Sequence, residues 1–356
     1  MDLDTLVRGG AGRGDYSHLL PFAWMLPTYY AAPAGKVIPS SGAPLLQLPD
    51  PDLQARAQRL LNVLYWTAQR HANLDGMVDE QTLKVFLAPE FLFRKGAQAA
   101  TAATDAGFGA YPESLRHELA GALYSAINGT PLFKNWLLVA GSLCASLTQR
   151  RGLLNTTFVL RGQRAQMDAS PPYVLLEKLY RPRLDDAAAA HLADADQSLA
   201  SRYALDPEQS LDNLIRWDGM MLGVELGLDH GQQTLRNDMN YLGRVLGPEV
   251  PGLDLQLIAS CGTSIIDPSC AVKDGGLVVL ADGHHTASQA SIEPRFQIGR
   301  YDAQRGVLVP LLSSDIVFSE LPRGDDYQID YMRGRYAQLG RRQGVWSCKA
   351  KIPLQG

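Results

Sequence analysis

The chain has 356 residues, of which 46% are hydrophobic, and its 33 basic and 37 acidic residues give a formal net charge of −4. A chain of this length and composition can bury a large core, which excludes a disordered protein. Its Lys and Arg residues are not clustered as in proteins that bind a phosphate backbone, so nucleic acid is not an expected partner.

The start of the chain and its cysteines predict where the protein works. Residues 1–18 are interpreted as a flexible leader, because they contain Gly, Arg and acids but no apolar run typical of a secretory signal. The best apolar run, 19–26, is far shorter than the roughly 20 residues of a membrane-spanning helix, so no membrane partner is expected. The cysteines show no paired spacing and are interpreted as free thiols, which predicts a cytoplasmic protein.

Strands and helices alternate along most of the chain. Apolar side chains at steps of three and four residues predict helices at 52–73, with Asp50 or Asp52 as its cap, and at 114–127. Residues 96–110 predict a loop rich in small side chains. Short apolar runs ended by small or polar residues predict strands at 22–27, 83–87, 136–140, 155–160, 173–176, 222–226, 255–259 and 277–281.

This alternation predicts an α/β protein with more than one covered sheet. We expect one domain over 19–290, interrupted by an insertion at 183–211 that is rich in Ala, Asp and Ser and predicts one or two helices. A C-terminal extension over 291–356 follows. It opens with hairpin-like signals around 299–301 and 306–310.

Three of the predicted strands end in residues that could carry chemistry. Glu90 follows Ala88-Pro89, Lys178 lies in Leu176-Glu177-Lys178-Leu179-Tyr180, and the run 223–227 reads Gly-Val-Glu-Leu-Gly. A partly buried carboxylate can act as a general base, because burial raises its pKa. A lysine at a strand end can stabilise the anion that forms when an amide or nitrile is attacked.

The order of these motifs resembles the nitrilase superfamily of carbon–nitrogen hydrolases over roughly residues 20–290. Leu87-Ala88-Pro89-Glu90-Phe91 is similar to the motif of the catalytic base, and Glu177-Lys178-Leu179 to that of the lysine. Residues 139–142, 154–156 and 255–260 resemble other strands of the family. The resemblance implies a four-layer αββα sandwich, a Glu, Lys, Cys triad, a dimer, and hydrolysis of non-peptide carbon–nitrogen bonds without a cofactor.

Gly227 occupies the position where that family has its nucleophilic cysteine. Removing the nucleophile from a comparable triad costs about a millionfold in turnover. The first hypothesis is therefore a catalytically silent or severely impaired homologue whose pocket holds a small amide, nitrile or carboxylate. Two alternatives are an active hydrolase that uses another nucleophile, with Cys261 as the candidate, and a scaffold protein. A third account of Gly227 is an engineered or recent change in an active hydrolase.

Further residues are candidates for supporting roles. The family's second glutamate is assigned to Glu208, while Glu225 would share a face with Gly227 only in a regular strand. Asp229, His230 and Cys261 are candidates for ligand contacts. No metal site is expected, because Asp282-Gly283-His284-His285 has no second ligand cluster at a metal-binding spacing.

Overall fold

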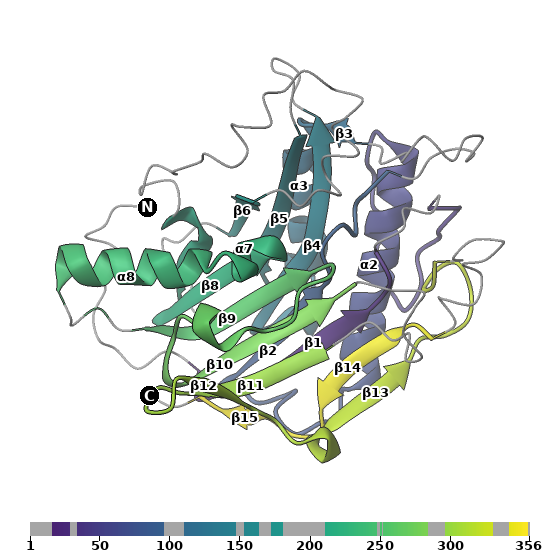
Figure 1. The fold of residues 1–356 in the computed structure, drawn as a ribbon. Coiled ribbons are helices and arrows are strands. Elements are labelled where there is room, and N and C mark those ends of the chain that lie inside the picture. Colours follow the sequence, from purple (N-terminus) through teal and green to yellow (C-terminus); the bar gives the residue numbers. More distant parts are fainter. Residues whose placement is uncertain are drawn as a thin grey trace.

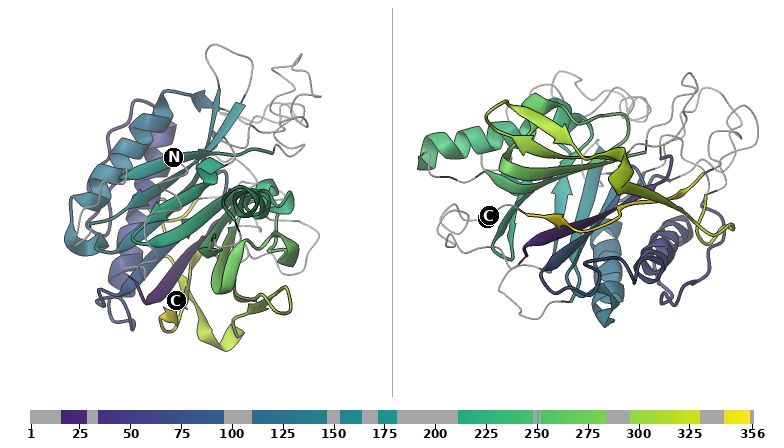
Figure 2. Two further views of the ribbon diagram at one scale, coloured as in Figure 1. Left: turned by 90° about the vertical axis from the view of Figure 1, so that its left-hand side faces the viewer. Right: turned by 90° about the horizontal axis from the view of Figure 1, so that it is seen from below.

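The computed structural model describes residues 16–28, 34–95, 110–146, 153–163, 172–180, 211–247, 250, 252–283, 296–329 and 342–354. Within these residues two β-sheets lie face to face, and helices cover the outer side of each sheet (Figures 1 and 2). The predicted four-layer αββα sandwich is therefore confirmed.

The first sheet has the strand order β13-β14-β1-β2-β4-β5-β6, with β15 paired to β1 and β3 paired to β4. Strands β1, β2 and β4 are parallel, β5 is antiparallel to β4, and β6 is antiparallel to β5, so β2, β4 and β6 end at the same edge. The strands are β1 His18–Met25, β2 Thr82–Ala88, β3 Tyr111–Pro112, β4 Trp136–Ser146, β5 Leu153–Arg161, β6 Tyr173–Glu177, β13 Ile316–Glu320, β14 Gly344–Cys348 and β15 Ile352–Pro353.

The second sheet has the strand order β12-β11-β10-β9-β8-β7. Its central strands β8, β9 and β10 are parallel, so their carboxyl ends also share one edge. The strands are β7 Leu214–Trp217, β8 Met220–Leu226, β9 Leu253–Ser260, β10 Val272–Asp282, β11 Phe296–Asp302 and β12 Val307–Pro310. The carboxyl ends of parallel strands are the usual place for a ligand site in an α/β protein.

Side-chain alternation along the strands builds the layers. Alternate residues of β2 and β8, such as Val85 and Val224, pack in the core between the two sheets. Their neighbours point outward, so that Phe86 packs under the helices of the first sheet. The same alternation directs Glu225 of β8 away from the core between the sheets.

Helices α2, Pro51–Arg70, and α3, Leu115–Asn128, cover the first sheet. Asp50 caps α2 by accepting hydrogen bonds from the backbone N–H groups of Asp52 at 2.9 Å and Leu53 at 3.0 Å, which confirms the predicted cap. Leu60 of α2 is fully buried, and burying such a side chain stabilises the fold by about 1.5–3 kcal/mol. The short helix α7, Leu228–Gly231, and helix α8, Thr234–Leu246, lie on the second sheet.

The structure contains a strand at each predicted position, with ends shifted by a few residues. The hairpin predicted after residue 291 is formed by β11 and β12, and strands β11 to β15 extend both sheets. Residues 1–15, 96–109 and 181–210, which contain most of the predicted leader, loop and insertion, lie outside the described residues.

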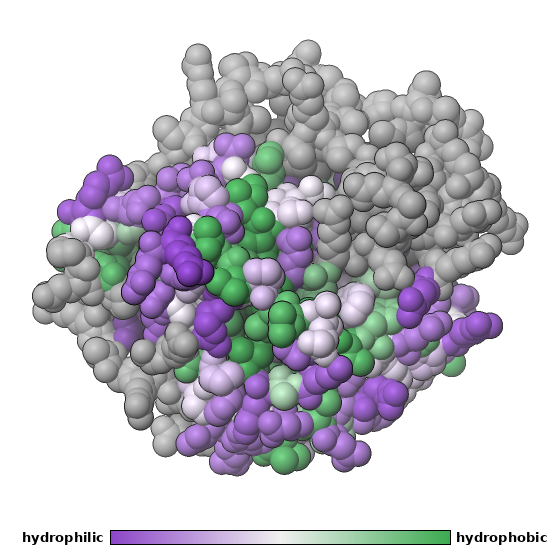
Figure 3. All heavy atoms as spheres, turned by 60° about the horizontal axis from the view of Figure 1, so that its bottom comes forward, coloured by the Kyte–Doolittle hydropathy of each residue, from purple (hydrophilic) through white to green (hydrophobic). Residues whose placement is uncertain are grey.

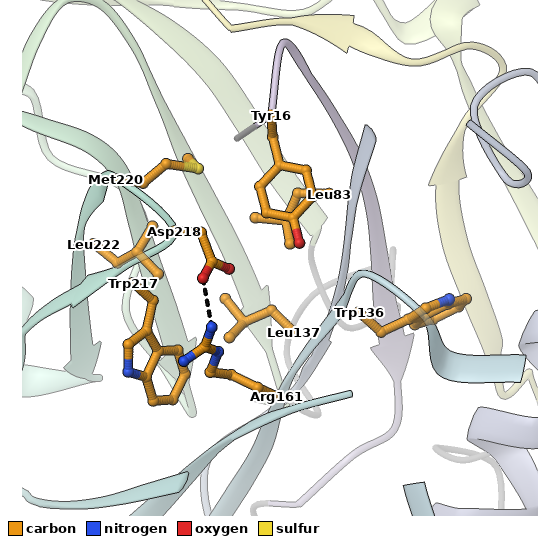
Figure 4. A pocket seen from close by; sticks show the side chains of 9 residues that line it. All are labelled: Tyr16, Leu83, Trp136, Leu137, Arg161, Trp217, Asp218, Met220 and Leu222. Atoms are coloured by element: carbon orange, nitrogen blue, oxygen red, sulfur yellow. Dashed lines mark hydrogen bonds and ion pairs between the residues drawn. The ribbon is translucent and has the colours of Figure 1, made fainter. Parts of the chain in front are cut away.

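A buried ion pair joins the two sheets where several of their strands begin. Arg161 at the end of β5 lies 2.5 Å from Asp218 in the turn between β7 and β8, and both side chains are less than 10% exposed. The guanidinium carbon also lies 4.9 Å from the ring centroid of Trp217. Figure 4 shows these groups beside a cavity of about 10 Å³, which has room for about one water molecule.

Candidate functional site

Three strand ends bring Glu90, Lys178 and Gly227 together. Glu90 follows β2, Lys178 directly follows β6, and Gly227 directly follows β8. The Nζ atom of Lys178 lies 2.5 Å from Oε1 of Glu90, and each side chain is 1% exposed. A Cβ atom placed on Gly227 would lie less than 3.0 Å from Oε2 of Glu90. The three residues singled out from the sequence are therefore neighbours across the two sheets.

Gly227 has a backbone conformation that suits glycine. Its φ is +43° and its ψ is −102°, and side-chain-bearing residues adopt such positive φ values only at a cost. Its N–H donates to the Ala259 carbonyl at 3.0 Å, and its carbonyl accepts from the His230 N–H at 3.1 Å. With no side chain at this position, the Glu90 carboxylate occupies space that a larger residue would need.

Two further contacts hold Glu90 in place. The Nδ2 atom of Asn155 on β5 donates to Glu90 Oε1 at 2.9 Å, and the Glu90 N–H donates to the Ser260 carbonyl at the end of β9 at 3.3 Å. Glu90 is thus connected to strands of both sheets. Asn155 was not predicted as a site residue, because its strand also contains Thr156 and Thr157, so a further polar side chain there was no signal.

Phe91 adopts a strained conformation next to Glu90. Its φ is +63°, which is uncommon for an aromatic residue, and its N–H donates to Ser142 Oγ at 2.9 Å. The Lys178 ammonium lies 5.2 Å from the Phe91 ring centroid, and the Arg94 guanidinium carbon lies 4.3 Å from it. The ring therefore lies close to two cations, an arrangement that stabilises their charges.

Asp229 ties the turn after β8 to the chain after β6. Its buried carboxylate accepts from the backbone N–H of Tyr180 at 2.8 Å and of Leu179 at 3.1 Å. Burial raises the pKa of Asp229 to about 8, although the nearby Lys178 ammonium and the two N–H groups act in the opposite direction. A ligand contact by Asp229 stays a prediction.

The carboxylates of Glu225 and Glu177 are bonded to groups other than Lys178, and Glu208 cannot be placed. Glu225 accepts from His230 and from the Leu235 N–H on the α8 side of the second sheet. The Glu177 carboxylate pairs with Arg116 of α3 and accepts from the Thr156 hydroxyl. Glu208 lies outside the described residues.

His230 lies on the α8 side of the second sheet. Its side chain is fully buried, and its ring lies 2.8 Å from Glu225 on the outer face of that sheet. A ligand contact by His230 stays a prediction. A histidine three residues after Gly227 carried no sequence signal for the direction of its ring.

Cys261 lies at the site but is poorly suited to act as a nucleophile. It is half-buried and follows Ser260, whose carbonyl accepts from the Glu90 N–H. Burial raises the pKa of the Cys261 thiol, and the nearby carboxylates of Glu90 and Asp282 raise it further. Because the thiolate is the reactive form, these surroundings suppress the reactivity of Cys261.

The described part of the chain contains no cluster of three or more His, Cys, Asp or Glu side chains that could hold a metal ion. His284 and His285 of the polar turn considered above lie outside that part.

Of the helices built by the described residues, none is long and apolar enough to cross a bilayer.

Two hollows lined by described residues lie away from Glu90. One of about 590 Å³ lies between residues 42–47, α2 and α3, and one of about 390 Å³ lies beside β11 and β12. Figure 3 shows polar and apolar side chains interspersed over one face, with several apolar ones near its centre. The most exposed large apolar side chains are Val78, Leu312, Leu45, Ile38 and Val245.

The site offers a buried carboxylate and a buried ammonium to a polar group. The carboxylate of Glu90 can accept a proton or a hydrogen bond, and the ammonium of Lys178 can donate one to an oxygen or nitrogen atom. Gly227, the third residue at this point, supplies no side-chain nucleophile.

Comparisons with known proteins give only distant similarities. No protein-family model and no curated protein matches the sequence. Among solved structures, the chain is similar to Nit3 of Saccharomyces cerevisiae, a member of branch 10 of the nitrilase superfamily, with a TM-score of 0.44 and 9% identity over 96% of this chain and 93% of that one.

Two further structures are similar to about the same degree. A mutant of the amidase from Nesterenkonia sp. AN1 in complex with butyramide has a TM-score of 0.41 and 15% identity over 95% of this chain and 92% of that one. XC1258 from Xanthomonas campestris is a CN-hydrolase superfamily protein with an arsenic adduct in its active site. It has a TM-score of 0.39 and 13% identity over 83% of this chain and 86% of that one. Similarities at this level carry no argument about activity, which depends on the residues of the site itself.

Proposed function

We propose that this protein is a carbon–nitrogen hydrolase homologue that binds a small amide, nitrile or carboxylate and is catalytically silent or severely impaired. The observation that carries the proposal is the contact between Glu90 and Lys178 beside Gly227. A base and a hydrogen-bond donor are in place, and the position expected for the nucleophile has no side chain. A cytoplasmic, homodimeric protein remains part of the proposal.

The site gives a physical reason for the impairment. A triad needs a nucleophile whose proton a neighbouring base can take. Glu90 faces Gly227, which has nothing to deprotonate, and the thiol of Cys261 has a raised pKa. Hydrolysis through Cys261 is therefore the second candidate, supported by the position of this residue next to the end of β9.

The deciding experiment compares the unmodified protein with Gly227→Cys and Gly227→Ala on a panel of aliphatic amides and nitriles. Intact-mass measurement detects an acyl adduct on the new thiol, and calorimetry measures binding of the amides to the unmodified protein. Gly227→Ala is the matched control, because it adds the same Cβ atom against Glu90 without a thiol.

Turnover and an adduct in Gly227→Cys alone, with amide binding by the unmodified protein, would support the proposal. Turnover by the unmodified protein that disappears in Cys261→Ala would overturn it in favour of the second candidate. If no form binds or turns over any of the compounds, the scaffold hypothesis replaces both.

A further inference from the structure

A buried polar network lies behind the site, on the outer face of the second sheet. The carboxylate of Glu225 accepts hydrogen bonds from the Leu235 N–H at 2.9 Å, from Gln256 Nε2 at 2.8 Å and from His230 Nδ1 at 2.8 Å. Glu225, His230 and Gln256 are each at most 1% exposed. Buried polar groups of this kind are costly unless they are hydrogen-bonded, so the arrangement is highly specified.

The hydrogen bonds determine which ring nitrogen of His230 carries a proton. The Ile266 N–H donates to His230 Nε2 at 3.0 Å. A ring nitrogen that accepts carries no proton, so the proton lies on Nδ1, where it is donated to Glu225. The bonds therefore run in one direction, from Ile266 through His230 to Glu225.

This network connects the two segments that flank Glu90. His230 is three residues after Gly227 and donates its N–H to the Gly227 carbonyl at 3.1 Å. Ile266 closes the segment 261–266, which begins with Cys261 directly after the end of β9. That strand end accepts from the N–H groups of both Gly227 and Glu90.

We propose that His230 is a positioning residue of the ligand site: by accepting from the Ile266 N–H it holds segment 261–266 at a fixed distance from the turn that carries Gly227. It acts on the position of Cys261, which directly follows the strand end that accepts from the Glu90 N–H. The inference rests on the proposed function, because it supposes that Glu90 and Lys178 bind a small ligand.

Two substitutions of His230 separate its two hydrogen bonds. His230→Asn can keep a donor near the Nδ1 position and so retain the bond to Glu225, but it has no atom near Nε2 to accept from Ile266. His230→Gln is longer and can place its amide oxygen near Nε2, which retains the bond from Ile266. Leu60→Ala in the buried face of α2 serves as a control for general loss of stability.

The readouts are the labelling rate of Cys261 by N-ethylmaleimide, located by peptide mass, and the affinity for butyramide. We expect His230→Asn to label Cys261 at least about tenfold faster and to bind butyramide about tenfold more weakly, a change of about 1.4 kcal/mol. We expect His230→Gln and Leu60→Ala to stay close to the unmodified protein in both measurements.

Labelling in His230→Asn that is no faster than in Leu60→Ala, or equal effects of Asn and Gln, would overturn the inference. The labelling rate needs no ligand, so a lack of butyramide binding by the unmodified protein counts against the proposed function alone. If the variants do not fold, amide hydrogen exchange in the unmodified protein decides: an Ile266 amide as protected as those of β9 supports the inference, and fast exchange refutes it.

Discussion

Gly227→Ala tests whether the position of the Glu90 carboxylate depends on the absence of a side chain at residue 227. The substitution places an L-residue at a φ of +43°, which costs about 1–2 kcal/mol. Its Cβ atom would also lie too close to Glu90 Oε2. Moving that carboxylate weakens a charged hydrogen bond to Lys178 of a kind that contributes about 1.5–3 kcal/mol. We therefore expect a loss in the free energy of unfolding that exceeds the backbone part and reaches at most about 5 kcal/mol, if the hydrogen bond is lost entirely.

Urea unfolding followed by tryptophan fluorescence measures this loss. Gly243→Ala in α8 is the matched control, because an added Cβ meets no atom within 4 Å there and Ala is the better helix former by about 0.5–1 kcal/mol. In a Glu90→Ala background, the cost of Gly227→Ala should fall to its backbone part of about 1–2 kcal/mol. Equal effects of Gly227→Ala and Gly243→Ala, or the same cost in both backgrounds, would refute the reasoning.

Three further predictions concern buried charges. Lys178→Met removes the ammonium that lies 2.5 Å from the Glu90 carboxylate and should lower the free energy of unfolding by about 3–5 kcal/mol. The same substitution should cost less in a Glu90→Gln background, and strictly additive effects of the two substitutions in urea unfolding would contradict this. The pKa of Asp229 is about 8 in the native state and near 3.8 in the unfolded chain, and Lys178 and Glu225 are the charged groups that act on it. Between these two pH values the native state binds the extra proton, so the free energy of unfolding should fall as the pH rises, by at most about 1.4 kcal/mol per pH unit. Asp229→Asn should flatten that dependence in urea unfolding at pH 5 and pH 8, and an unchanged slope would assign it to other groups. Asp218→Asn removes the charge beside Arg161, while Asn tolerates the φ of +62° at this position, so we expect the melting temperature to fall. A melting temperature equal to that of the unmodified protein would show that the ion pair contributes nothing to stability.

The sequence predicted the strands well because each is a short apolar run with a clear end. It also predicted that Glu90, Lys178 and Gly227 meet, since the motifs that carry them each follow a strand. The contact with Asn155 could not be predicted, because it depends on the pairing of β5 between β4 and β6.

Other features escaped the sequence for equally physical reasons. Helix α8 was not predicted, although Leu235, Met239 and Leu242 recur at steps of four and three residues on its packed face; the polar residues between them and Gly243, a weak helix former, obscured this pattern. Strand β13 lies at an edge of the first sheet, where its half-exposed positions show no regular alternation. Strand β14 lies between β13 and β1 and is mostly buried, but it is short and contains Gly344 and Ser347. The direction of His230 was not predictable, because a turn, unlike a strand or helix, has no period that assigns its side chains to a face.

The pairing of β1 with β14 sets an order in which the chain can fold. Phe22 lies opposite Ser347 in this antiparallel pair, so β1 has to wait for a partner strand that follows 347 − 22 = 325 residues later in the chain. Closing so long a loop is slow, and β1 meanwhile exposes an unpaired edge that favours aggregation. The first sheet is therefore completed only after β14 has been synthesised, and folding before that point has to proceed without the full sheet.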